Sequence, residues 1–340
     1  MIRRSRVKLA PSAPSDSVYF AEDTLDDLLR LVFESILRLG RHVKPTKGWN
    51  RELSGVLLEL RQPQARLSRT ETKGTVFSAL GETLWYLAKS NKLEQITYYL
   101  PSYRRFSDDL HTLYGAYGPR LFTMHGKFDQ IQNVLVLLKR KPTTRQAVIQ
   151  LFDAADITKE RKDIPCTCTL QFLIREGRLH MITNMRSNDA YLGLPHDIFA
   201  FTFLQELLAR SIGVRLGTYK HAVGSLHLYD SDRAKARQFL REGWQSTISM
   251  PSMPSGDPWP SVARLLSIEA RIRQGEIVRL DSIRLPNYWA DLARLLQIFA
   301  NTKRNRAIVD IKNQMTTNVF DPYIEKREKM TRSGRGRLTQ

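Results

Sequence analysis

The segment from Pro165 to Asp197 constrains the fold more than any other part of this 340-residue chain. It combines two apolar runs, 167–174 and 179–185, with the short sequence REGR between them. Two such runs joined by a tight turn predict a β-hairpin. An Arg-Ser-Asn-Asp run, a Gly-Leu-Pro turn and a long apolar stretch follow. The sequence therefore predicts a hairpin that leads into a long helix.

Composition sets wide limits on the rest. With 42% hydrophobic residues, the chain can bury a full core as one large or two small domains. No apolar run approaches the length of a membrane span, and the basic amino terminus has no apolar stretch behind it, so we expect a soluble, cytoplasmic protein. The two cysteines, Cys166 and Cys168, alternate on a predicted strand and face opposite ways. We expect no disulfide and no metal site.

The formal net charge of +19 predicts an anionic partner. Nucleic acid, a nucleotide phosphate and a polyglutamylated folate all qualify, so charge alone does not choose between them.

Helical patterns flank the sheet-forming segments. Thr24, followed by Asp27 at the third position, predicts the start of a helix with apolar residues at helical spacing through Leu39. A second helix is predicted around GETLWYL, where Glu82 lies in an apolar setting that normally needs a reason. A surface or helix-pairing glutamate is the plainer interpretation of Glu82.

The segment 165–197 closely resembles the part of thymidylate synthases that carries the nucleophilic cysteine after a proline, the phosphate-binding Arg-Ser pair and the LGLP turn. The resemblance implies that Cys166 is the nucleophile, that Arg186 and Ser187 bind the substrate phosphate, that Asp189 contacts the folate pterin, and that Gly193 lets the base approach closely. A cysteine on a buried strand is more often an inert small hydrophobe. A guanidinium within several ångströms would favour the thiolate instead.

Other stretches resemble the same family less closely. The resemblance implies roles for Glu82 in proton transfer, for Tyr117 of YGAYGPRL in the active-site hydrogen-bond network, and for Arg51 of WNRELSG in phosphate binding from a loop. Arg145 would reach the phosphate bound by the partner subunit of a two-fold homodimer. On the predicted strand SLHLY, His227 and Tyr229 face the same side, where the resemblance places the sugar 3′-hydroxyl.

Several positions depart from the family. Gln146 replaces the second of two paired arginines, Thr167 replaces the histidine after the cysteine, and Ser225 replaces an aspartate. No tryptophan occurs between Trp85 and Trp244, so one of three tyrosines is expected in place of the family's shielding tryptophan: Tyr98, Tyr99 or Tyr103. His221 has no matched role.

Asp197 lies where the family has the asparagine that recognises uracil. An asparagine offers one donor and one acceptor, whereas an ionised carboxylate only accepts and would repel the uracil O4. Cytosine presents an amino donor beside N3, which a carboxylate can match if one proton is shared. Asp197 therefore indicates a cytosine nucleotide, as in the hydroxymethylase branch of the family. The alternative is that Asp197 caps the helix that follows.

We therefore predict an α/β (α+β) fold with a mixed sheet covered by helices, in a homodimer packed sheet to sheet. The expected parts are a flexible leader (1–20), a catalytic domain (21–245), a divergent helical part of the same domain (246–322) and a basic tail (323–340). The predicted reaction is 5-hydroxymethylation of dCMP, or of CMP, with 5,10-methylenetetrahydrofolate. Ser187 favours the deoxynucleotide. Alternatives are a thymidylate synthase acting on dUMP and a noncatalytic nucleotide- or nucleic-acid-binding homologue.

Overall fold

A computed structural model of the chain describes residues 19–45, 47–68, 75–242, 247–302 and 304–333. The described strands form one mixed sheet of seven strands in the order β1-β3-β7-β6-β5-β4, with the short β2 paired to β3. This confirms the predicted mixed α/β fold. The strands are β1 (Tyr19–Glu22), β2 (Arg41–Val43), β3 (Asn50–Leu60), β4 (Val148–Gln150), β5 (Thr167–Arg175), β6 (Arg178–Asp189) and β7 (Arg215–Tyr229).

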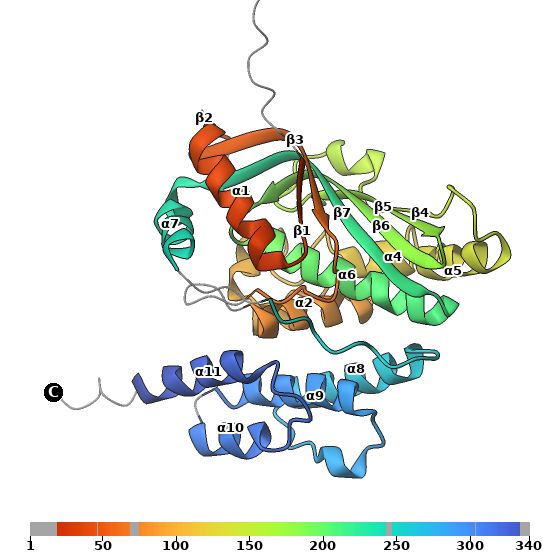
Figure 1. Ribbon diagram of the computed structural model, residues 1–340, viewed down its shortest axis with the longest axis vertical. Coiled ribbons are helices and arrows are strands. Elements are labelled where there is room, and N and C mark those ends of the chain that lie inside the picture. The colour runs from red at the N-terminus through yellow and green to blue at the C-terminus, as the bar shows by residue number, and fades with distance from the viewer. Residues whose placement is uncertain (1–18, 46, 69–74, 243–246, 303, 334–340) are drawn as a thin grey trace, which may run out of the picture.

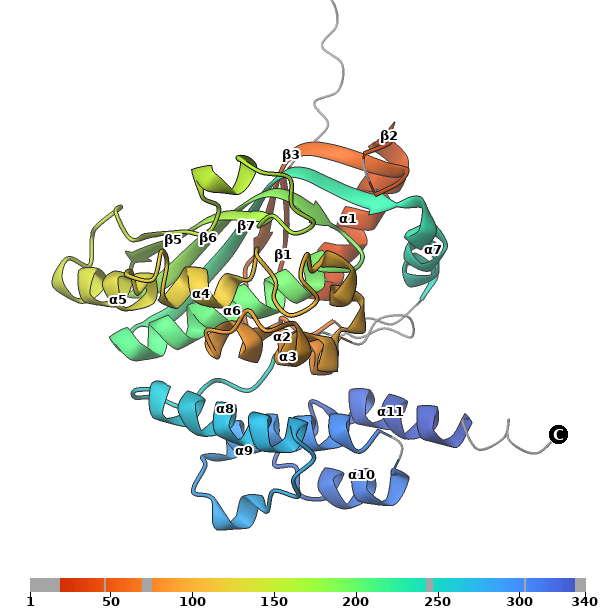
Figure 2. The same ribbon diagram turned by 180° about the vertical axis from the view of Figure 1, so that it is seen from behind.

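Helices pack against this sheet and against one another. In Figures 1 and 2, α6 and α2 run beneath the sheet, and α8 to α11 form a further layer below them. The helices are α1 (Leu25–Leu39), α2 (Val76–Leu87), α3 (Leu93–Tyr99), α4 (Tyr117–Phe122), α5 (Gln130–Arg140), α6 (Gly193–Ile212), α7 (Arg233–Arg241), α8 (Trp259–Arg273), α9 (Asn287–Ala300), α10 (Asn305–Lys312) and α11 (Asp321–Ser333). Short 3-10 segments lie at Pro101–Phe106, Ala154–Ile157, Asp230–Asp232 and Leu280–Ser282. No helix in the described ranges is long and apolar enough to cross a membrane.

Local sequence signals explain the first helix and the central hairpin. The Thr24 side chain accepts a hydrogen bond from the Asp27 backbone N–H at 3.2 Å, which satisfies one of the free donors at the start of α1. Between β5 and β6, Glu176 and Gly177 both have positive φ (51° and 67°), as a two-residue hairpin turn requires. The predicted helix start and hairpin are both confirmed.

A kink in the central strands changes which residues face the helices. Along β6 the buried side chains are odd-numbered up to Met185, and then Asn188 is buried. Along β7 they are odd-numbered up to Val223, and then Leu226 and Leu228 are fully buried. Gly224 lies at this change, where an added Cβ would stand 2.9 Å from a β6 backbone oxygen. Odd-numbered residues before the kink and even-numbered residues after it therefore lie on the same face of the sheet.

The carboxyl-terminal helices are joined to the sheet-bearing part by specific contacts. The Tyr99 hydroxyl donates to Glu269 of α8 at 3.0 Å, and the Trp259 indole N–H donates to Ser211 of α6 at 2.9 Å. Near the end of the chain, Tyr323 and Ile324 are 4% and 0% exposed. The tail was predicted to begin at residue 323, but this residue lies inside α11 (Asp321–Ser333), and its first side chains pack into the fold.

The predicted leader and tail can be followed only in part. Residues 1–18 of the leader, the boundary near 245 and residues 334–340 of the tail lie outside the described residues.

A fully buried ion pair links three segments of the chain. Arg66 and Glu206 of α6 are both 0% exposed and in direct contact. Glu206 also accepts from the Gln64 amide at 3.0 Å and the Met253 backbone N–H at 2.9 Å. Burial alone would raise the pKa of Glu206, but Arg66 and these donors outweigh it and lower the pKa. The ionised pair is thus part of the folded structure.

Replacing Glu206 should therefore destabilise the protein strongly. Glu206→Gln leaves the Arg66 charge buried without a counter-ion, and we expect the free energy of unfolding to fall by about 3 kcal/mol or more. Urea unfolding followed by circular dichroism measures this. The matched control is Arg271→Gln, which removes an exposed ion pair with Glu276 (2.7 Å) and should cost less than about 1 kcal/mol. Equal losses in the two variants would contradict the assignment.

Candidate active site

Cys166 lies in the loop that enters β5, and Arg186 of β6 holds that loop in place. The Arg186 backbone N–H donates to the Cys166 carbonyl at 2.8 Å. The Arg186 guanidinium donates through Nε to the Pro165 carbonyl (3.0 Å) and through Nη2 to the Ile164 carbonyl (2.9 Å). The structure thus brings together the cysteine and the arginine that the sequence paired.

For the pKa of the Cys166 thiol, however, the effect of burial is larger than the effect of the neighbouring positive charges. The pKa of Cys166 is raised by burial, and Arg186 and Lys47 only partly oppose this, while Asp197 adds to it. Arg186 does lower the pKa of Cys166, as predicted, but this effect is smaller than the rise caused by burial. The thiol therefore keeps its proton in the free protein at neutral pH.

The Thr167 side chain fixes Tyr117 next to the cysteine. The Tyr117 hydroxyl oxygen accepts from the Thr167 backbone N–H at 3.1 Å and from its side-chain hydroxyl at 3.0 Å. Burial is the main reason that the pKa of Tyr117 lies well above its ordinary value. Tyr117 is therefore a protonated phenol close to Cys166.

Glu82 of α2 is buried, and two tyrosines bind its carboxyl group. Tyr86 donates to Oε1 at 3.0 Å, and Tyr103 donates to the same oxygen. Burial raises the pKa of Glu82, and these two hydrogen bonds oppose the rise. The structure thus gives one of the three candidate shield tyrosines, Tyr103, a direct partner in the site. Sequence reasoning missed Tyr86, although its spacing of four residues from Glu82 on a helix was a usable signal.

Asp197 lies in the second turn of α6 and does not cap that helix, which begins at Gly193. Its side chain is partly accessible, yet the surrounding protein desolvates the carboxyl group. That burial, together with the nearby carboxyls of Glu82 and Asp189, raises the pKa of Asp197 well above its ordinary value. The Asn188 amide donates to its Oδ2 at 2.7 Å. The raised pKa therefore favours the protonated, neutral form of the Asp197 carboxyl group.

The ends of β6 and β7 align the remaining predicted residues. Ser187 pairs with Ser225, and Asp189 pairs with His227. Asp189 also accepts from the backbone N–H groups of Tyr191 and Leu192, which holds the turn into α6.

Two further contacts complete this part of the site. The rings of His227 and Tyr229 meet edge to face at 5.0 Å, and burial lowers the pKa of His227. An added Cβ on Gly193 would stand 3.0 Å from the Asn188 amide nitrogen, so a larger residue here would have to push that amide aside.

Two predicted phosphate-binding arginines take no part in the contacts described above. Arg51 is in β3 rather than in a loop, where it pairs with Leu228 and donates to the Gly40 carbonyl at 3.4 Å. Arg145 is exposed just before β4, at the opposite edge of the sheet. Their roles stay predictions. Lys47, which sequence reasoning missed, is a cation whose charge acts on both Cys166 and His227.

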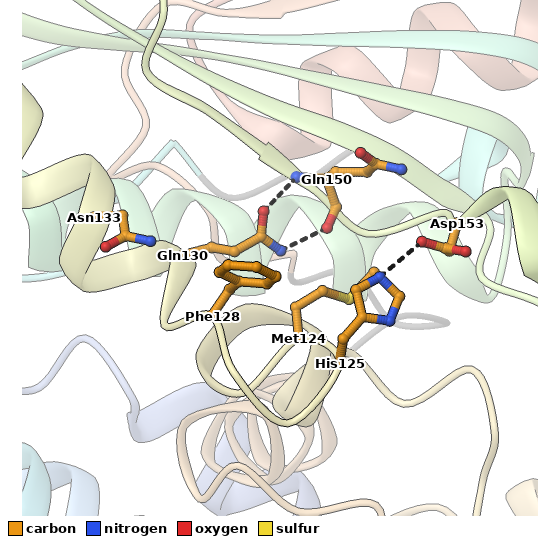
Figure 3. A pocket seen from close by; sticks show the side chains of 7 residues that line it. All are labelled: Met124, His125, Phe128, Gln130, Asn133, Gln150 and Asp153. Atoms are coloured by element: carbon orange, nitrogen blue, oxygen red, sulfur yellow. Dashed lines mark hydrogen bonds and ion pairs between the residues drawn. The ribbon is translucent and has the colours of Figure 1, made fainter.

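A separate hollow, drawn in Figure 3, lies beside α5 and β4. His125 and Asp153 form an ion pair there at 3.0 Å, and the Gln130 side chain bonds the Gln150 backbone. None of the predicted site residues lines this hollow. Within the described ranges, no group of His, Cys, Asp and Glu residues is arranged to hold a metal ion.

The raised pKa of Cys166 has a measurable consequence. In a Cys168→Ser variant, alkylation of Cys166 by iodoacetamide should reach half its maximal rate at a higher pH than for cysteine in a short peptide, because burial disfavours the thiolate. Arg186→Leu should move the midpoint higher still. Stopped-flow alkylation across pH measures both, and a midpoint below neutral pH would exclude this account of the thiol.

Comparison with known proteins covers the same region. Residues 50–255 match the family model described as thymidylate synthase. Three curated relatives are named deoxyuridylate hydroxymethyltransferase. That of Pseudomonas phage M6 is 34% identical over 174 residues (50% of this chain, 49% of the relative). Those of Delftia phage PhiW-14 and Bacillus phage SP01 are 29% identical over 216 residues (59% and 59%) and 28% over 214 residues (59% and 56%). The matches thus span about half to three-fifths of each relative.

Proposed function

Because this chain belongs to the thymidylate synthase family, we propose that it hydroxymethylates C5 of a pyrimidine deoxynucleoside monophosphate, with 5,10-methylenetetrahydrofolate as the one-carbon donor. One observation carries the proposal: Cys166, Tyr117, Glu82 and Asp197 converge on a single site beside Arg186. The names of the three phage relatives support hydroxymethylation rather than methylation.

The residues around Glu82 suit a folate. The Tyr103 ring meets Trp85 and Phe106 edge to face, each at 5.9 Å. Tyr103 and Phe106 are partly exposed and so offer apolar surface to a pterin, while the buried Trp85 supports Tyr103 from behind. Lys47 and Arg105 lie over Phe106 at 4.4 and 4.7 Å and offer positive charge to an acidic tail. When bound, methylenetetrahydrofolate supplies a one-carbon unit at the oxidation level of formaldehyde.

The protein's own groups would divide the remaining work. Cys166 adds through Sγ to C6 of the pyrimidine, which makes C5 a carbon nucleophile. Arg186 and Ser187 bind the phosphate, and His227 and Tyr229 bind the sugar hydroxyl. Two hydrogens of the Arg186 guanidinium are occupied by backbone carbonyls, and its other donors stay available to the phosphate.

The state of Asp197 bears on the base. The prediction of a cytidylate assumed an ionised carboxylate that would repel the uracil O4. A neutral carboxyl instead offers one O–H donor and one carbonyl acceptor, as an asparagine does, and so matches uracil. Because the relatives are named for deoxyuridylate, we place dUMP first as the substrate.

Deoxycytidylate is the second candidate, and the protonated Asp197 also favours it. A carboxyl that accepts from the cytosine amino group and donates to N3 makes two good hydrogen bonds. Ser187 leaves the deoxynucleotide preferred over CMP.

Product analysis tests the proposal. The protein is incubated with methylenetetrahydrofolate and C5-tritiated dUMP, dCMP or CMP, and products are identified by mass. We expect tritium release from dUMP, gain of a hydroxymethyl group and formation of tetrahydrofolate. Cys166→Ala should reduce turnover by at least about 10³-fold because the nucleophile is lost, while Cys168→Ala should retain most activity.

Other results would select the alternatives. A methyl product with dihydrofolate identifies a thymidylate synthase. No release from any nucleotide, together with salt-sensitive nucleic-acid binding that Cys166→Ala leaves unchanged, identifies a noncatalytic binding protein.

The proposed homodimer gives a separate test of Arg145. If each site uses the partner's Arg145, then Arg145→Ala and Cys166→Ala proteins, each weakly active alone, should restore roughly a quarter of wild-type activity when unfolded and refolded together in equal amounts, since half of the dimers then hold one intact site. Analytical ultracentrifugation checks the dimer itself. Absence of any recovery from dimers shown to exchange subunits would place Arg145 outside the site.

A further inference from the structure

A buried chain of hydrogen bonds ends on Asp197. The Tyr219 hydroxyl bonds to Nδ1 of His221 at 2.7 Å, and Nε2 of His221 bonds to Oδ1 of Asn188 at 3.1 Å. The Asn188 amide nitrogen then donates to Oδ2 of Asp197 at 2.7 Å. Tyr219 and His221 are fully buried, and Asn188 is 4% exposed. The strand kink makes this possible, because it brings His221 and Asn188 to one face.

The hydrogens of this chain have a definite direction. Burial lowers the pKa of His221 to about 3, so the ring is neutral and carries one N–H. Burial also keeps the Tyr219 phenol protonated by raising its pKa. Nε2 faces Oδ1 of Asn188, a carbonyl oxygen that can only accept, so the single ring hydrogen lies on Nε2. The bare Nδ1 then accepts from the Tyr219 hydroxyl. The Asn188 amide N–H therefore points at Asp197.

We propose that Tyr219, His221 and Asn188 are positioning residues that fix Oδ2 of Asp197 as a hydrogen-bond acceptor and leave its proton on Oδ1, so that the site selects one pyrimidine base. This inference rests on the proposed function, in which Asp197 contacts the base. It assigns a role to His221, for which the sequence gave no match.

Selection needs a fixed proton because a free carboxyl group would accept both bases. Uracil presents N3–H as donor and O4 as acceptor, whereas cytosine presents an amino donor and N3 as acceptor. A neutral carboxyl whose proton can change oxygen matches either pattern. A carboxyl group whose acceptor oxygen is fixed can match only one base, the one whose donor faces that oxygen and whose acceptor faces the O–H group. The other base would leave buried polar groups unpaired.

The surroundings support a built arrangement. Rotating the Asn188 amide by 180° would turn its NH₂ group toward the N–H of His221 and its oxygen toward Asp197, so His221 holds the amide in place. Gly193 leaves room for the amide nitrogen, since a Cβ would stand only 3.0 Å from it. The charged groups that act on Asp197 from neighbouring elements are Glu82 of α2 and Asp189 of β6, both acidic.

Calorimetric binding of dUMP and dCMP to the full chain tests the inference without catalysis. We expect the wild type to prefer dUMP by about tenfold or more. His221→Leu frees the Asn188 amide to rotate, and the two affinities should come within about threefold of each other. His221→Gln supplies an amide N–H near the place of Nε2 and should restore the preference. The matched control, His180→Leu, removes a β6 histidine bonded to Thr218 at 3.0 Å and should leave the preference unchanged.

A second measurement keeps the inference testable if His221→Leu does not fold. Nitrogen-15 spectra of histidine-labelled wild type, assigned with His221→Gln, should show His221 neutral with its hydrogen on Nε2. A hydrogen on Nδ1 would reverse the chain and overturn the inference. So would a base preference that survives in folded His221→Leu.

The outcomes separate this inference from the proposed function. Loss of base preference in His221→Leu supports the inference whether or not any nucleotide is hydroxymethylated. Hydroxymethylation with an unchanged preference supports the function and overturns the inference. The direction of the wild-type preference itself decides between dUMP and dCMP.

Discussion

Two acidic side chains, Glu82 of α2 and Asp197 of α6, lie near each other, and the surrounding protein shields both from water. The rest of the site depends on this desolvation of two neighbouring carboxyl groups. Each carboxyl is bound by neutral donors, the tyrosines Tyr86 and Tyr103 on one side and Asn188 on the other. Two ionised carboxylates without cations would be costly in such surroundings, so the favourable state holds protons instead. The packing of α2 against α6 maintains the desolvation that raises the pKa of both carboxyl groups.

The sheet places Cys166 and Arg186 relative to these acids. Arg186 ties the Cys166 loop to β6, and Asp189 turns the end of β6 into α6, which carries Asp197. The kink of β6 and β7 then turns Asn188 and His221 to the same face. A straight strand pair would place these two side chains on opposite faces, and the hydrogen-bonded chain to Asp197 would not form.

Sequence patterns predicted what depends on short-range chemistry. The REGR turn, the Thr24 cap and the approach of Arg186 to Cys166 follow from a few neighbouring residues. The kink was not predictable. It changes which alternate residues are buried along β6 and β7, and the sequence of these strands gives no sign of that change. The raised pKa of Asp197 was missed because it depends on burial in the folded chain and on the carboxyl group of Glu82, 115 positions away in the sequence. Arg51 looked like a loop arginine, but β3 begins at Asn50 and turns it toward Gly40.

The protonated state of Asp197 also bears on how a thiol with a raised pKa can act under the proposed function. A bound phosphate dianion would offset the charge of Arg186, so phosphate binding cannot be what activates Cys166. Addition of sulfur at C6 moves negative charge onto the exocyclic oxygen of uracil. A neutral Asp197 that donates to this oxygen stabilises that charge as it forms, whereas an ionised one would oppose it. Burial thus makes the Cys166 thiol less acidic and favours the form of Asp197 that can donate a hydrogen bond. Under the proposed function, the addition is then promoted by the hydrogen bond from Asp197 to the bound base rather than by a thiolate in the free protein.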